Sequence, residues 1–393
     1  MKMMPFEAGE RMSLLEHPAA PVDATLTRPS RYAYADNLKV LLVIGVIVAH
    51  ATMAWTGVGT WVFDEPPVRE PLLSALSVLE LVGALFGLAL FFLIAGAFTP
   101  RSLVRKGLRR FLVDRAVRLG VPMVFFILVL SPVVEYANPD VAGWTRGFPA
   151  FAVHTWWPPV PGPTWFLGVL LVFSAVYAVV RTVFPRRPAT TPMRARHLWA
   201  AGMIVVVGSY LVRIAVPLGE ERWHLAVGQA PAWIVGFTIG VVGAERGWFD
   251  RIPSTTSRRL CQVGWAAVAG TALVLGTANA LGADLDPFGG GGTWQSLVVT
   301  VIEAALVVAM SLWLLDVFRR RFDRQGPLLG VLSRAAFAAF VVHQVVLVGL
   351  VLATRHVPWP PEVEYLGVAA LGVAGSFALA WLLLRLPGVS RIV

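Results

Sequence analysis

The chain has 393 residues, of which 57% are hydrophobic and only 14% are charged, and its mean hydropathy is +0.70. Because a soluble domain carries about 25% charged residues, this composition excludes a soluble globular protein and predicts an integral membrane protein with several spans. The net charge of +10 does not indicate a nucleic-acid partner, because the positive residues lie between apolar segments, as a lipid bilayer requires.

The N-terminal residues 1–32 are polar and rich in proline and alanine. They lack the apolar core of a signal peptide, so we expect the first apolar segment to stay in the membrane uncleaved. This composition predicts a disordered cytosolic tail over 1–32, followed by a membrane domain over 33–387. The single cysteine, Cys261, excludes an internal disulfide and a metal site built from several cysteines.

About ten apolar segments follow the tail, and each is long enough to cross a bilayer as an α-helix. We therefore expect an all-α fold that is embedded in the membrane as a polytopic protein. The predicted spans cover residues 35–57, 72–98, 119–136, 165–183, 198–216, 230–244, 260–281, 294–318, 335–353 and 365–385.

The distribution of lysine and arginine predicts the orientation of these spans. The loops on one side of the membrane hold 20 of these residues, and the loops on the other side hold 4. Cytosolic loops carry the excess of positive charge, so the basic set of loops is predicted to be cytosolic. An even number of spans then places both termini in the cytosol.

Four ionisable residues lie inside predicted spans, at similar depth in the outer half of the membrane: His50, Glu80, Glu303 and His343. His50 follows Lys39 by eleven residues, which is about 16 Å along a helix. If Lys39 lies at the cytosolic surface, His50 lies in the outer half of a bilayer about 30 Å thick. Hydrocarbon solvates ionisable groups badly, so these residues are candidate catalytic groups. The alternative is that each makes a hydrogen bond to a neighbouring helix, and the pattern leaves open which glutamate, if either, orients the histidine.

The other polar and aromatic candidates carry weaker signals. We expect Arg213, near an outer helix end, to extend to the membrane surface. The four glycines at 289–292 lack the Lys-Ser/Thr of a phosphate loop and predict an external turn. Trp165, with Trp156 and Trp157, either stacks on a sugar or belongs to the interfacial aromatic belt. No histidine pair has zinc spacing and no nucleophile-elbow motif occurs, so we expect neither a metal nor a permanently bound cofactor.

A second group lies on the predicted cytosolic side and consists of Asp36, Lys39, Arg115 and Arg118. The two arginines are three residues apart, so they share one face of a helix. A face of this kind binds phosphate through charge-assisted hydrogen bonds. The alternative is that these are ordinary positive charges of a cytosolic loop.

Several stretches together resemble acyltransferase family 3, the bacterial membrane O-acyltransferases. The first is RYAYADNLKVLLVIGVIVAH, in which Lys39 and His50 match the family's basic residue and histidine. The family's Arg-x-x-Arg pair is matched by Arg115 and Arg118 in FLVDRAVRLGVP, and its late motif resembles SRAAFAAFVVHQVVL with His343. Two further similar stretches are FFLIAGAFTPRSLVRKG and PTWFLGVLLVFSAVY.

The resemblance covers about 34–385 and is closest to the branch that includes the glucan succinyltransferase. Two departures are Ala95-Gly96-Ala97, where the family usually has Ser-Gly-Phe/Tyr, and Val342, where it often has leucine. Neither departure removes a candidate chemical group.

The resemblance implies a multi-pass protein of the bacterial inner membrane. Such an enzyme moves an acyl group, of acetyl or succinyl type, from cytosolic acyl-CoA to a hydroxyl of a carbohydrate or cell-envelope glycoconjugate. The basic group would hold the coenzyme's phosphates, and His50 would act as the general base.

A different class of function is a proton-coupled transporter, in which His50, Glu80, Glu303 and His343 form a relay. The cytosolic basic group and the absence of inverted repeats favour the enzyme. The acyl chain, the acceptor and the oligomeric state are beyond what the sequence indicates.

Overall fold

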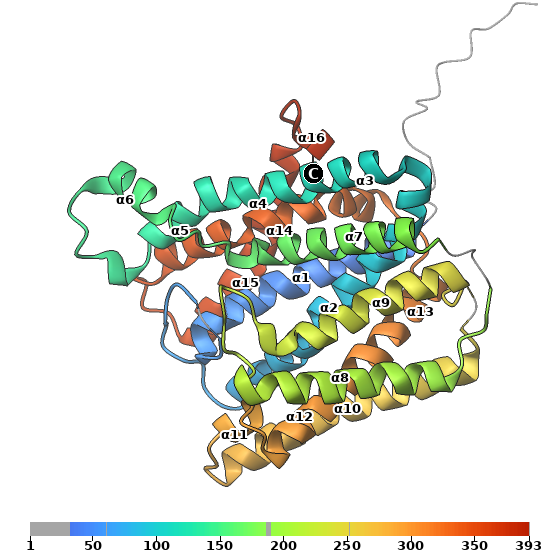
Figure 1. The fold of residues 1–393 in the computed structure, drawn as a ribbon. Helices are drawn as coiled ribbons and strands as arrows, with labels where there is room; N and C mark the ends of the chain where they lie inside the picture. Colours follow the sequence, from blue (N-terminus) through green and yellow to red (C-terminus); the bar gives the residue numbers. More distant parts are fainter. Residues whose placement is uncertain (1–31, 60, 186–189, 251, 393) are drawn as a thin grey trace, which may run out of the picture.

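The computed structural model describes residues 32–59, 61–185, 190–250 and 252–392, and these residues form a bundle of helices without a β-sheet (Figure 1). Ten of the described helices are long and apolar enough to cross a membrane. The chain is therefore an all-α polytopic membrane protein, as predicted. The predicted tail lies outside the described residues except for Tyr32.

Eight of the ten spans contain one continuous α-helix each. These helices are α1 (Ala33–Thr56), α2 (Leu72–Lys106), α7 (Trp165–Val183), α8 (Ala195–Ala215), α9 (Ala230–Arg246), α10 (Ser254–Ala280), α14 (Pro327–Thr354) and α15 (Pro361–Leu383). In the spans of α7 and α9 the helix is preceded by a 3₁₀ turn.

The other two spans change locally from α-helix to π-helix. One comprises α3 (Leu108–Arg115), α4 (Val121–Phe125) and α5 (Ser131–Tyr136), and the other comprises α12 (Trp294–Ala305) and α13 (Ser311–Arg321). Short helices outside the spans are α6 (Gly147–Thr155), α11 (Asp286–Gly289) and α16 (Val389–Ile392).

Two of the π segments have a cause that can be read from the sequence. Residues 116–120 and 126–130 form one π turn each, and Pro122 and Pro132 follow them closely. Proline lacks an N–H and its ring clashes with the carbonyl four residues before it, so the preceding turn of the helix widens. The span nevertheless continues without a break from Leu108 to Tyr136.

The helix ends differ from the hydropathy boundaries where charged residues continue a helix. The second span was expected to end at 98, but α2 extends to Lys106, and α14 begins at Pro327 rather than at 335. Arginine, lysine and leucine favour helix, so hydropathy marks the membrane surface and not the end of the helix. The long loop predicted after the third span also contains the short helix α6.

Helix α1 lies in the middle of the bundle (Figure 1) and packs against α2, α14 and α15. A second contact, between α2 and α9, relies on glycine. A Cβ atom on Gly236 or Gly240 would collide with the backbone carbonyl of Ala89 or Leu93. Small residues allow helix backbones to approach this closely in membranes, so these glycines fix α9 against α2.

Candidate active site

The structure brings together the two histidines that the sequence places 293 positions apart. His50 of α1 and His343 of α14 have ring centroids 4.9 Å apart, and the rings meet edge to face at 63°. His343 is fully buried, whereas His50 is partly exposed. Of the two histidines, His50 is therefore the more exposed.

Hydrogen bonds to backbone carbonyls fix how both imidazoles are presented. Nδ1 of His50 lies 2.8 Å from the Val46 carbonyl oxygen, and Nδ1 of His343 lies 2.6 Å from that of Phe340. A carbonyl oxygen only accepts, so we assign the hydrogen of each neutral ring to Nδ1. Each Nε2 then carries a free lone pair, and that of His343 is buried without a partner. The backbone, and neither glutamate, orients His50.

Trp61 forms a wall of this site that the sequence analysis did not identify. Its indole ring lies 5.7 Å from the ring of His50, centroid to centroid, and its Nε1 is buried without a hydrogen-bond partner. Trp61 belongs to the connection between α1 and α2, which carries no motif. Its only sequence signal is a large aromatic residue in a short connection between two spans.

The Trp-Phe-Leu stretch forms a second wall. A Cβ atom on Gly162 would lie 2.8 Å from Oε1 of Gln344, an atom that is buried without a partner. Phe166 contacts Phe340 at 6.1 Å between ring centroids. The loop before α7 therefore packs on α14 next to His343, and Gln344 joins the site as a polar residue that the sequence analysis missed.

The tryptophans expected near a sugar or at the membrane interface occupy different surroundings. Trp165 packs on Trp233 of α9, with ring centroids 4.8 Å apart, so it belongs to the packed interior of the bundle. Trp156 and Trp157 follow α6 and are 44% and 82% exposed. Of the three, Trp165 alone lies on the helix that bounds the histidine site.

Glu80 does not contact either histidine. It lies on α2, is buried, and accepts a hydrogen bond of 3.2 Å from the hydroxyl of Thr56 at the end of α1. Thr56 is six residues beyond His50, about 9 Å further along the helix. Glu80 therefore lies nearer the end of the bundle than the histidine pair.

The predicted exposure of Arg213 is wrong. This residue is fully buried on α8, and its guanidinium bonds Oε1 of Glu303 on α12 at 2.7 Å. Its Nε also donates to the Gly228 carbonyl at 3.1 Å, and its own carbonyl accepts from the N–H of Gly291 in the glycine-rich turn. Both side chains are fully buried, so each charge needs an oppositely charged partner, and the two residues supply it for each other.

The four intramembrane residues thus divide into three separate places. His50 contacts His343, Glu80 contacts Thr56, and Glu303 contacts Arg213. In the described part of the chain, no contact of either glutamate involves a histidine. A proton relay through all four residues, as the transporter hypothesis requires, is not continuous in this structure.

The basic group at the opposite end of α1 converges on the end of α2. Lys39 pairs with Asp36 at 3.0 Å and lies over the ring of Phe98, whereas Arg115 donates to the hydroxyl of Thr99 at 3.4 Å. Phe98 and Thr99 are neighbours on α2, so the helix ending brings two predicted donor-site residues to one place.

Arg118 has a different partner from Arg115. It pairs with Asp114 at 3.3 Å, and the same carboxylate bonds Lys106 of α2 at 2.6 Å. Asp114 and Lys106 are further members of this charged group that the sequence analysis did not single out.

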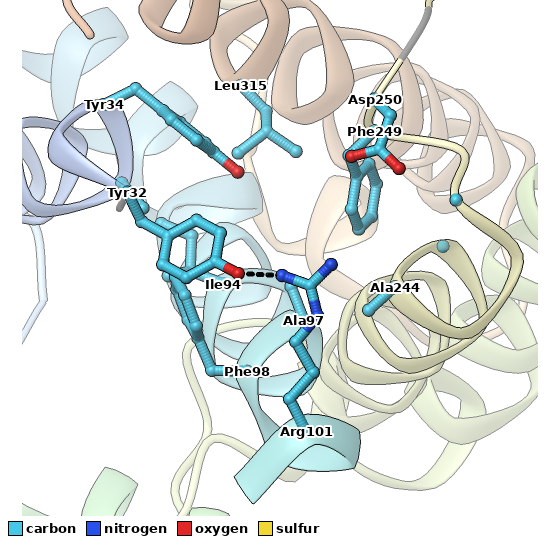
Figure 2. A pocket seen from close by; sticks show the side chains of 13 residues that line it. Tyr32, Tyr34, Ile94, Ala97, Phe98, Arg101, Ala244, Phe249, Asp250 and Leu315 are labelled. Carbon is cyan, nitrogen blue, oxygen red and sulfur yellow. Dashed lines mark hydrogen bonds between the residues drawn. The ribbon is translucent and has the colours of Figure 1, made fainter. Parts of the chain in front are cut away.

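A small cavity adjoins this basic group (Figure 2). The guanidinium of Arg101 bonds the hydroxyl of Tyr32, and the side chains of Tyr34 and Asp250 approach from other elements. The cavity volume is about 40 Å³, which holds a few water molecules and no nucleotide. A large donor molecule would therefore have to bind mainly outside it, over the exposed arginines.

The chain is similar to known proteins over most of its length. The model of the family described as an acyltransferase domain (Acyl_transf_3) matches residues 32–385. The proteins named glucans biosynthesis protein C of Salmonella gallinarum and of Salmonella agona are similar. Each is 23% identical over 279 residues, which cover 66% of this chain and 68% of the relative. No solved structure matches the chain.

Proposed function

Because the chain belongs to the acyltransferase 3 family and is a multi-pass acyltransferase of a bacterial membrane, we propose that it transfers an acyl group from acyl-CoA to a carbohydrate hydroxyl at the His50–His343 pair. The observation that carries the proposal is the presentation of two Nε2 lone pairs, 4.9 Å apart between ring centroids, inside an apolar bundle. Neutral imidazole nitrogens of this kind accept protons near neutral pH.

In the proposed reaction His50 is the general base. The acceptor's hydroxyl oxygen forms a bond to the acyl carbon as its proton passes to Nε2 of His50. The carbon–sulfur bond of the thioester breaks, and the proton moves to the leaving sulfur, so the products are an ester and free coenzyme A. His343 stays buried behind His50 and holds the edge of its ring.

The basic group at the other end of α1 would hold the donor. Lys39, Arg115 and Arg118 lie eleven residues or more from His50 in sequence, at the end that the charge distribution predicts to be cytosolic. An extended thioester arm could then reach from a surface-bound nucleotide to the histidines. Asp36 would orient Lys39, which it already bonds.

The acceptor is proposed from the relatives. Their name refers to the biosynthesis of glucans, which are carbohydrates with free hydroxyls, and an acyltransferase needs such a nucleophile. A glycan of the cell envelope would approach His50, which is the more exposed of the two histidines. The acyl group of the donor would be of acetyl or succinyl type.

The test is transfer by purified protein in detergent. Isotopically labelled acetyl-CoA and succinyl-CoA are each incubated with envelope glycan, and ester formation is followed by mass spectrometry. Wild-type protein is expected to label the glycan with one donor. The variant Arg115→Ala is expected to bind that donor about ten- to hundredfold more weakly, because one charge-assisted contact contributes about 1.5–3 kcal/mol. Unchanged donor binding in the double variant Arg115→Ala, Arg118→Ala would contradict the assignment of the donor site. Absence of transfer from both donors by wild-type protein contradicts the proposed function.

A further inference from the structure

Trp61, whose ring packs beside that of His50, carries a hydrogen-bond donor that no described residue accepts from. Indole Nε1–H only donates, and buried tryptophans usually find an acceptor for it. In Trp61 this atom is buried without any partner, although the ring lies 5.7 Å from that of His50. A missing partner at this place is most simply supplied by the substrate.

Acyl transfer creates a group that needs such a donor. When the hydroxyl oxygen attacks a thioester, the carbonyl oxygen becomes negatively charged while the carbon is tetrahedral. Enzymes stabilise this oxyanion with fixed N–H donors aimed at it in a site with little water. The attacking oxygen and the oxyanion share one carbon, so the base and the oxyanion donor must be close neighbours. His50 and Trp61 meet this requirement.

The residues that follow Trp61 are anchored to the rest of the bundle. Phe63 is buried, and the Arg355 guanidinium lies over its ring at 4.9 Å and pairs with Glu65 at 3.6 Å. The N–H groups of Glu65 and Val68 donate to carbonyls at the end of α1, at 2.9 and 3.2 Å. A donor whose backbone is anchored in this way reorganises less during the reaction than one on a free loop.

We propose that Nε1–H of Trp61 stabilises the oxyanion of the tetrahedral intermediate formed beside His50. The inference rests on the proposed acyl transfer and adds a second catalytic residue to it. The bonds made and broken are the same as in the proposed transfer: the carbon–oxygen bond forms and the carbon–sulfur bond breaks. The indole keeps its hydrogen throughout.

Trp55 provides a matched control within the same region. Its Nε1 is also buried without a partner, but its ring faces Tyr365 of α15, with centroids 5.9 Å apart, and contacts neither histidine. Replacing either tryptophan by phenylalanine keeps an aromatic ring and removes one N–H. A general effect of losing a buried indole N–H should therefore appear in both variants.

The experiment measures kcat and KM for acyl transfer by wild type, Trp61→Phe, Trp55→Phe and His50→Ala, with thermal unfolding in detergent as a check on folding. Replacement of Trp61 by benzothienylalanine, which has sulfur in place of the N–H, keeps the shape of the ring. Removing one oxyanion donor typically lowers kcat about 10²–10³-fold, so both changes at 61 should do so without changing either KM. Trp55→Phe should keep the wild-type kcat.

Three results would overturn the inference: full kcat in Trp61→Phe, a change confined to KM, or an equal loss of kcat in Trp55→Phe. If His50→Ala is inactive, each of these results is still consistent with the proposed function. Failure of wild-type protein to transfer an acyl group, in contrast, contradicts the proposed function and this inference with it.

Discussion

At the scale of single residues, the Arg213–Glu303 pair places two charges in a fully buried region between α8 and α12. Burying two charges costs free energy, and the attraction between them offsets this cost only while both are present. We therefore expect a single substitution to destabilise the protein and a joint replacement by apolar residues to be tolerated. No contact connects it to the histidines among the described residues. We therefore assign it a structural role in joining the two helices.

Arg213→Leu and Glu303→Leu should each lower the free energy of unfolding by about 3–5 kcal/mol, because each leaves one buried charge without its partner. The double variant should recover most of that loss and retain acyl transfer. The exposed pair Arg222–Glu220 serves as a control, since Glu220→Gln should change stability by about 1 kcal/mol or less. Thermal unfolding in detergent measures all four variants. A stable double variant without activity would instead give Glu303 a role in the chemistry.

At the scale of elements, hydropathy was sufficient to predict which segments cross the membrane. It could not predict the helix extension to Lys106, because the charged turn lies outside the apolar run but favours helix. Nor does hydropathy encode which helices touch. His50 and His343 were each identified as candidates, but their contact depends on the packing of α1 against α14, which is decided by side-chain shape.

Depth in the membrane was likewise a poor guide to the composition of the site. Glu303 and His50 were grouped because they lie at similar depth, yet the packing of α12 on α8 directs the glutamate to Arg213. Trp61 lies at the site without any motif, and Gln344 follows His343 in the late motif without having been singled out, so the three-dimensional arrangement identifies both.

At the scale of the whole molecule, the proposed reaction depends on which end of the bundle faces the cytosol. The excess of positive charge predicts that the end with Lys39 and Arg115 faces the cytosol, where acyl-CoA is present. The end with Trp157 then faces outward, towards the acceptor. Donor and acceptor would meet at the histidine pair from opposite sides of the membrane.

Labelling of introduced cysteines tests this orientation. Cys261 is the only native cysteine, so Cys261→Ser provides a clean background. Val104 and Trp157 are 87% and 82% exposed, and they lie at opposite predicted sides. With a membrane-impermeant maleimide on intact cells, Trp157→Cys should react, whereas Val104→Cys should react only after lysis. The reverse pattern would place the basic group outside the cell, where it could not bind a cytosolic donor.

The most direct test of the central claim compares substitutions of the two histidines in a transfer assay. His50→Gln keeps a group that can bond the Val46 carbonyl, but an amide cannot take a proton. If His50 is the general base, His50→Gln and His50→Ala should both lower turnover about 10²–10⁴-fold, with donor binding unchanged. Near wild-type transfer by His50→Gln, together with an inactive His343→Ala, would contradict the account and assign the base to His343.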